Sequence, residues 1–370
     1  MPSILAQFPV YIFKVFIQDW VSAYQLTQLD AALCNVKDRL VFLNNIQNLL
    51  VSISISASDV SKCFDWCIRR EVGIARLTIS EGQWNGVVPS SFPELKLRYL
   101  NISARQWNLV NMILRDNYPY FEEFVVNSNH LFGECTGKIP ASCSRVSLKC
   151  FCSSIRQSDL SVLFSRVERL QQLSIKTLHS NRDLNSRLAT ILDKVGHSLT
   201  RLSLITGSHP TLQQDVDLIS TECPGLVNLQ LNVDCDEVNL KCLTRLSSLT
   251  HLKLKRIVIW EVDPGNLFTA VTHFSVPYDR LQAPKLRLFP SLTHLTLTGG
   301  TAPKAARLML WVREYDQIRV MDVRECVFLD KDRQKLIEES EELVLSRNMT
   351  HAGLSASNSS CSSSLHWIFE

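Results

Sequence analysis

The chain has 370 residues, of which 45% are hydrophobic and 20% charged, the composition of a folded globular protein. Its 39 basic and 36 acidic residues give a net charge of +3, an even balance that indicates neither a nucleic-acid nor a membrane partner. The apolar beginning carries Lys14 and Asp19 and lacks the basic start and cleavage site of a secretory signal, so we expect neither a leader nor a membrane span.

Residues 1–50 predict a small helical bundle, in which Pro9 suits the first turn of a helix. Apolar residues recur at helical spacing in two stretches: Ile12, Val15, Phe16 and Trp20, then Leu26, Leu29, Leu33, Val36 and Leu40. A bundle of about 45 residues is marginally stable alone. We therefore expect it to lean on the first repeats, and we interpret residues 51–73 as a helical connection and N-terminal cap of the solenoid.

Residues 74–326 carry an internal repeat: an apolar residue, two free positions, an apolar residue, one free position and an apolar residue. The clearest copies begin at Leu199, Leu226, Leu249 and Leu292. Weaker copies begin at Ile74, Leu97, Phe121, Cys143, Leu170, Val271 and Ile318. These eleven copies are separated by 21 to 29 residues, a spacing typical of leucine-rich repeats.

The repeat predicts stacked strands, because its second and third apolar positions lie two apart on one strand face. One such strand cannot bury that face alone, whereas a stack of parallel strands makes one continuous core. Two of the segments that connect successive strands are predicted to be helices, Arg182–His197 and Leu212–Glu222. We therefore predict an α/β leucine-rich-repeat solenoid, with parallel strands on the concave side, helical or irregular returns on the convex side, and a small helical domain before them.

The C-terminal part predicts a cap and a tail. Residues 327–347 suit a capping helix, and its acidic run, Glu338–Glu342, suits a solvated face. Residues 348–370 are expected to be disordered, because they include the serine-rich stretch Ser355–Ser364.

No motif for catalysis or cofactor binding is evident. The sequence lacks HExxH, GxSxG, GxxxxGK[ST] and GxGxxG, and we interpret Gly299-Gly300-Thr301 as a turn of the repeat. The twelve cysteines show no zinc-ligand spacing, so we expect buried thiols in a reducing compartment, either cytoplasm or nucleus. We expect no catalytic residue, cofactor or metal; an enzyme with a cryptic site is the alternative that a deep polar pocket would favour.

The free strand positions of the repeat should form a polar face with an excess of cations. Only Glu123 and Asp322 are acidic there. Eight positions are basic: Arg76, Arg145, Lys149, Lys176, Arg201, Lys253, Lys255 and Arg324. This excess either suits an acidic or phosphorylated partner or reflects only the need for a polar face.

Three histidines occupy one position in successive copies: His251, His273 and His294. Neighbouring strands lie about 4.8 Å apart, so the three rings should stack in a column. Neutral stacked rings are one interpretation and a contact sensitive to protonation is another. A metal site would need further ligands, which the sequence does not show.

The stretch Ile219–Leu231, with its Cys223-Pro224-Gly225, resembles the cysteine-containing repeat of F-box/leucine-rich-repeat proteins. The N-terminal helices resemble an F-box-like domain: Phe8-Pro9 stands for the opening Leu-Pro pair, Ile12, Phe16 and Trp20 fill the first helix, Leu26 and Leu29 fill the next, and Cys34 lies near the Val-Cys pair. This sequence departs from the family at Phe8, lacks the Asp before Leu26, and has no closing Trp.

The resemblance implies a substrate-recruiting subunit of a cullin-type ubiquitin ligase. A Skp-type adaptor, and through it the cullin ligase core, would bind Pro9, Ile12, Phe16, Trp20, Leu26 and Leu29. An unidentified protein substrate, acidic or phosphorylated, would bind Arg76, Arg145, Lys149, Lys176, Arg201, His251, Lys253, Lys255, His273 and His294 on the repeats. The alternative is a repeat scaffold unrelated to ubiquitination.

Overall fold

The structure is a computed structural model. It describes residues 23–33, 36–46, 50–56, 59–80, 95–103, 107–115, 118–127, 135–149, 156–177, 184–208, 212–261, 265–281, 283–299, 305–326, 333–338 and 366–368. The chain divides into two compact units, Met1–Ser198 and Leu199–Glu370, which are described separately.

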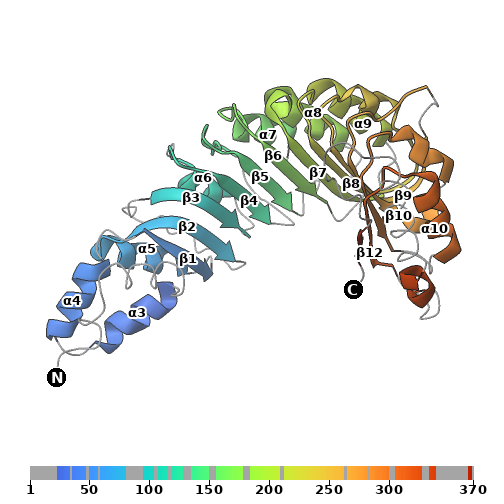
Figure 1. The fold of residues 1–370 in the computed structure, drawn as a ribbon. Coiled ribbons are helices and arrows are strands. Elements are labelled where there is room, and N and C mark those ends of the chain that lie inside the picture. Colours follow the sequence, from blue (N-terminus) through green and yellow to red (C-terminus); the bar gives the residue numbers. More distant parts are fainter. Residues whose placement is uncertain are drawn as a thin grey trace, which may run out of the picture. The chain divides into compact units, whose positions relative to one another are not determined.

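The first unit opens with helices and continues as alternating strands and helices (Figure 1). Its elements are α3 (Ala23–Ala32), α4 (Val36–Ile46), β1 (Leu50–Ser56), α5 (Val60–Arg69), β2 (Gly73–Ser80), β3 (Leu95–Ile102), α6 (Trp107–Ile113), β4 (Glu123–Asn127), β5 (Arg145–Lys149), α7 (Gln157–Leu163), β6 (Gln172–Lys176), α8 (Leu184–Val195) and the 3-10 turn η2 (Gly196–Ser198). Strands β1 to β6 pair in chain order, and every pairing is parallel.

The second unit repeats the same plan, with strands β7 to β13 paired in chain order. Its elements are β7 (Arg201–Ser208), α9 (Leu212–Glu222), β8 (Asn228–Asn239), η3 (Lys241–Arg245), β9 (His251–Glu261), β10 (His273–Pro277), η4 (Tyr278–Arg280), η5 (Ala283–Leu288), β11 (His294–Thr298), α10 (Ala305–Glu314), β12 (Val320–Glu325) and β13 (His366–Ile368). These pairings too are parallel.

The apolar triplets of the repeat form the core of each unit. Leu229 pairs with Leu202 on one side and Leu252 on the other, so equivalent positions lie in register. Every apolar residue of the eleven copies is at most 2% exposed. The predicted α/β leucine-rich-repeat solenoid is therefore confirmed.

Helices return the chain between strands on the side away from the polar face. The two helices predicted from periodicity are α8 and α9, and α9 spans the predicted residues Leu212–Glu222. In α8 the side toward the sheet carries Leu188, Ile191 and Val195, all fully buried. Each such burial contributes roughly 1.5–3 kcal/mol. In the described parts of the chain, no helix has the length and apolar character needed to cross a membrane.

The expected helical connection over residues 51–73 is wrong in its first part, which is strand β1. Val51 and Ile53 are buried there and pair in register with Ile74 and Leu77 of β2, so this strand adds to the core of the stack. The alternation of serine with valine and isoleucine has the period of a half-buried strand, not of a helix. Among the described residues of this stretch, α5 alone is an α-helix.

The structure of the C-terminal part agrees with the sequence-based prediction only in places. Residues 333–338, within the predicted capping helix, are helical. The expected disorder is wrong for His366–Ile368, which forms β13 and pairs with β12. A short extended segment can do so because the last strand of a stack still offers backbone hydrogen bonds. The serine-rich stretch Ser355–Ser364 lies outside the described residues.

The register predicts opposite outcomes for two adjacent residues of β8. Leu229 is fully buried, whereas Gln230 lies on the polar face. Leu229→Asp places an unpaired charge in the shared core and should destabilise the protein by on the order of 4 kcal/mol. Gln230→Asp should change stability by no more than about 0.5 kcal/mol. Urea unfolding followed by circular dichroism measures both, and equal midpoints for the two variants would show that the register is wrong.

Candidate functional site

The polar face of the first unit carries four of the predicted cations, and two of them are already engaged. The Arg145 guanidinium lies 3.3 Å from the carboxylate of Glu123 on the neighbouring strand. The Arg76 guanidinium lies over the ring of Tyr99, 4.7 Å from its centroid. These two side chains therefore interact with residues of neighbouring strands.

Lys149 and Lys176 are the other two predicted cations of this unit. They pair in register at the ends of β5 and β6, and both are exposed. Two ammonium groups on adjacent strands repel each other, so an anion that bridges them would relieve the repulsion.

In the second unit, three neighbouring strands place cations beside a row of carboxamides. Strand β8 presents the carboxamides at every second residue, and β9 presents basic side chains at the aligned positions. The aligned pairs are Asn228 with His251, Gln230 with Lys253, and Asn232 with Lys255. On the other side of β8, Arg201 is in register with Asn228 and is exposed. The sequence reasoning missed the carboxamide row, which its period of two could have revealed.

The predicted column of histidines is present. The His251 and His273 rings stack with centroids 4.1 Å apart and planes 11° apart. The His273 and His294 rings stack at 4.0 Å and 14°. Register alignment places the three rings on adjacent strands β9, β10 and β11.

A threonine precedes each histidine and anchors its ring, a contact that the sequence reasoning missed. The hydroxyl oxygens of Thr250, Thr272 and Thr293 lie 2.8, 2.9 and 2.8 Å from the Nδ1 atoms of the following imidazoles. Because the same contact recurs on each strand, all three rings take the same orientation. We name these six residues the Thr–His ladder.

The histidines of the Thr–His ladder are weak bases. Burial lowers the pKa of each imidazole below its ordinary value of 6.5. For His273 the rings on both sides add to this effect, and its pKa falls to about 4. Arg201 further lowers the pKa of His251, so the guanidinium acts on the ladder from two strands away. The three rings are therefore neutral at neutral pH.

The N-terminal helices are held on the first repeat by a buried carboxylate that the sequence did not reveal. Asp30 of α3 accepts hydrogen bonds from Nε of Arg39 on α4 (3.0 Å), Nε1 of Trp66 on α5 (3.3 Å) and Nε of Arg70 just after α5 (3.0 Å). Burial raises the pKa of Asp30, but the bonds from Arg39, Trp66 and Arg70 outweigh burial and hold that pKa below its ordinary value. We name these four residues the Asp30 cluster.

The structure describes only some of the predicted adaptor-binding residues. Pro9, Ile12, Phe16 and Trp20 lie outside the described residues. Leu26 and Leu29 both lie on α3, where the Leu29 side chain is half-buried. On α4, Leu40 is 54% exposed, so this helix shows a large apolar side chain to solvent.

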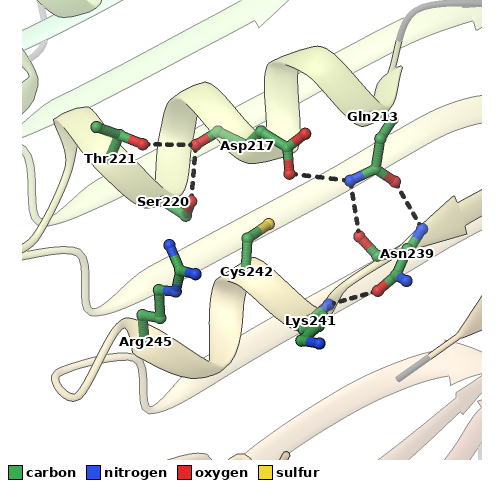
Figure 2. A pocket seen from close by; sticks show the side chains of 8 residues that line it. All are labelled: Gln213, Asp217, Ser220, Thr221, Asn239, Lys241, Cys242 and Arg245. Carbon is green, nitrogen blue, oxygen red and sulfur yellow. Dashed lines mark hydrogen bonds between the residues drawn. The ribbon is translucent and has the colours of Figure 1, made fainter. Parts of the chain in front are cut away.

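A pocket of about 510 Å³ lies on the helix side of the second unit, between α9 and η3 (Figure 2). One wall is fixed by Gln213, whose Nε2 donates to Asp217 (3.0 Å) and to the Asn239 carbonyl (3.1 Å), while its Oε1 accepts from the Asn239 backbone N–H (2.7 Å). Lys241 and Arg245 are the cations among its lining residues. The pocket is polar and weakly basic.

Cys242 in this pocket is a poor nucleophile. Burial, and then a hydrogen bond from the thiol to the Asp217 carboxylate, raise its pKa to about 11. The described residues contain no group of three His, Cys, Asp or Glu side chains that could hold a metal ion. This pocket can bind polar or charged groups, but it shows no activated group for chemistry.

A second pocket, of about 450 Å³, lies beside the first strand and carries a pair of cysteines from α5. Its lining includes Thr27, Ser54, Ser56, Lys62 and Cys63. The buried Cys67 thiol donates a hydrogen bond to Cys63 and thereby lowers the pKa of Cys63. The same bond and burial raise the pKa of Cys67. Among the described cysteines with a resolved pKa direction, Cys63 has a lowered pKa and the others have raised ones.

Comparison with protein-family models and with curated protein sequences gave no match. Among solved structures, a chain of the Rad7–Elc1 complex from yeast is similar over 87% of this chain and 90% of its own length, with 15% sequence identity and a TM-score of 0.41. An internalin, InlF, from Listeria monocytogenes is similar over 79% of this chain and 71% of its own, with 11% identity and a TM-score of 0.35. The fold assignment rests on the strand order and register of the chain itself.

The lowered pKa of His273 predicts a loss of stability in acid. Between the unfolded value of 6.5 and the folded value of about 4, the unfolded chain binds the proton more tightly than the folded protein. The stabilisation is complete above pH 6.5 and is lost as the pH falls toward 4. His273→Phe keeps a ring in the stack but cannot titrate, so its melting temperature should fall less than that of the parent between pH 7.5 and 4.5. Parallel curves for the two proteins would contradict the assignment.

The Asp30 cluster predicts that one neutral substitution loosens the N-terminal helices. Asp30→Asn keeps the shape but leaves Arg39 and Arg70 without a carboxylate, and should destabilise by on the order of 2 kcal/mol, a value reduced for the partial exposure of both arginines. Asp65→Asn, an exposed change on α5, is the matched control. Urea unfolding and hydrogen exchange of α3 measure the effect; equal exchange in both variants would mean that Asp30 does not hold the helices.

Proposed function

We propose that this chain is a non-catalytic protein-binding scaffold that recruits a substrate to a cullin-type ubiquitin ligase. The observation that carries the proposal is the Asp30 cluster, because it fixes the helices before the repeats to the first repeat. Its hydrogen bonds join α3, α4 and α5, and α3 also contacts β1. A recruiting subunit needs such a rigid junction between the part that binds the ligase and the part that binds the substrate.

In this proposal the N-terminal helices bind a Skp-type adaptor. The F-box-like pattern of Phe8-Pro9 and the apolar residues after it supports this assignment, and the exposed Leu40 offers an apolar side chain for the interface. The protein performs no chemistry itself. It raises the effective concentration of the substrate near the enzyme that transfers ubiquitin.

The substrate would bind the polar face of the repeats. The basic side chains there suit an acidic or phosphorylated segment, with Arg201 and Lys253 in the second unit and Lys149 and Lys176 in the first. We propose a cytoplasmic or nuclear location, which the thiol state of the cysteines in the described part of the chain supports.

Adaptor binding is the test of this proposal. The full chain should bind a purified, immobilised Skp-type adaptor at micromolar concentrations. Leu40→Asp should weaken binding at least about tenfold, the effect of a charge in a desolvated apolar contact. Leu310→Asp on α10 is the matched control. It places the same charge at an apolar side chain that is 58% exposed, but in the other unit.

The outcomes separate the two functions. Adaptor binding by the parent and by Leu310→Asp, with loss in Leu40→Asp, supports the ligase subunit. A parent protein that does not bind the adaptor favours the repeat scaffold unrelated to ubiquitination. Circular dichroism of each variant shows whether the fold is intact.

A further inference from the structure

The hydrogen bonds within the Thr–His ladder determine which nitrogen of each imidazole carries the proton. The carbonyl oxygen of Val227 accepts the backbone N–H groups of Thr250 and His251, both at 3.0 Å. The carbonyls of Thr250 and Thr272 each accept two N–H groups in the same way, at 2.9 and 3.0 Å. A carbonyl oxygen has two lone pairs, so these acceptors are full.

Each threonine hydroxyl has one proton and two neighbouring acceptors. The filled carbonyl oxygen lies 3.2–3.4 Å away, and the imidazole Nδ1 lies 2.8–2.9 Å away. The nearer, unfilled acceptor takes the proton, because a short bond to an open lone pair is the stronger one. Nδ1 therefore accepts, and a neutral ring with Nδ1 unprotonated carries its proton on Nε2.

The consequence is a row of N–H donors along the polar face. Nε2 is the ring nitrogen farther from the backbone, and all three rings are half-buried, with Nδ1 held at the base by threonine. The threonine anchor gives each ring the same orientation, so the donors follow the ring spacing of 4.0–4.1 Å. Two neighbouring donors can reach two oxygens of one oxyanion.

Charged side chains surround this row. Lys253 lies two residues beyond His251 on the same strand face, and Arg201 is near enough to act on the His251 pKa. Asp322 on this face is in register with Thr296, two residues beyond His294, whereas the carboxylate of Asp234 on β8 is paired with Arg256 at 3.1 Å. Cations therefore lie toward the His251 end of the ladder and the Asp322 carboxylate toward the His294 end, which places the anion between His251 and His273.

We propose that the Thr–His ladder binds an oxyanion of a partner segment, with the Nε2–H groups of His251 and His273 as its donors and Lys253 as its counter-charge. The oxyanion is the phosphate of a phosphorylated residue or the carboxylate of Asp or Glu. The inference rests on the proposed function in that the polar face binds the partner, but it does not depend on the adaptor or the ligase.

The tautomer is the first test. In the full chain labelled with ¹⁵N-histidine, long-range ¹H–¹⁵N correlation spectra at pH 7.5 should show Nδ1 unprotonated and Nε2 protonated for the three ladder residues. Thr272→Val removes one hydroxyl without changing the size of the side chain, and should shift His273 alone toward a mixture of tautomers. Nδ1-protonated rings in the parent would overturn the proposal.

Binding is the second test, with inorganic phosphate, a phosphoserine peptide and the same peptide carrying glutamate as probes. At constant ionic strength, each oxyanion that binds should shift the Nε2 signals of His251 and His273, and chloride should not. His273→Phe keeps the stack but removes one donor, and should weaken binding about tenfold or more, as expected for a hydrogen bond to a charged group. His197→Phe, in an exposed turn of the first unit, should bind as the parent does.

The probes separate the sources of the oxyanion. Tighter binding of the phosphoserine peptide than of the glutamate peptide assigns the site to a phosphorylated partner, and the reverse order assigns it to an acidic one. Equal affinity of the parent and His273→Phe for every probe overturns the ladder as a binding site. Adaptor binding measured on the same His273→Phe variant reports on the proposed function independently, since it should be unchanged.

Discussion

Each strand of this protein has an apolar face that it cannot bury by itself, and the rest of the structure depends on that constraint. Leu229 is fully buried only because Leu202 and Leu252 lie in register on the strands beside it. Burial is thus shared between neighbours, and each repeat contributes to the stability of the next. The segments that connect the strands can vary in length from repeat to repeat, because the buried apolar triplet determines where each strand lies.

The same register organises the polar face. Once the triplets align, the residues between them also align, so one position of the repeat becomes a column across the sheet. In the second unit this column runs Arg201, Asn228, His251, His273 and His294. The Thr200 carbonyl accepts two N–H groups as the carbonyls under the histidines do. The backbone is therefore alike along the column, and the side chains alone decide where the ladder begins and ends.

The sequence predicts what depends on local pattern and misses what depends on distant contacts. The eleven triplets and α9 are visible because each is a short run with a strict period. Strand β1 is hidden because serines separate its apolar residues, so the stretch reads as a connection. The Asp30 cluster joins residues 9, 36 and 40 positions apart, and no local pattern marks such a contact.

The candidate functional site is likewise predictable from the sequence only in part. Counting basic residues identifies the polar face, and periodicity alone predicts the stack of imidazoles. The same periodicity places Glu123 and Arg145 on adjacent strands, but it does not show that their side chains form an ion pair or that Arg201 acts on the histidines. Both depend on side-chain conformations that the repeat pattern does not specify.

A column of neutral rings can bind an anion without the repulsion that a column of cations at this spacing would bring to the sheet. Three ammonium groups on adjacent strands, about 4.8 Å apart, would repel one another and oppose the pairing of their strands. Imidazoles can instead stack at 4.0–4.1 Å, and the low pKa of His273 keeps the centre of the column neutral. Directional N–H donors then lie within the column while the net charge stays at its side, on Arg201 and Lys253. Such a surface can select an oxyanion by geometry without weakening the sheet that carries it.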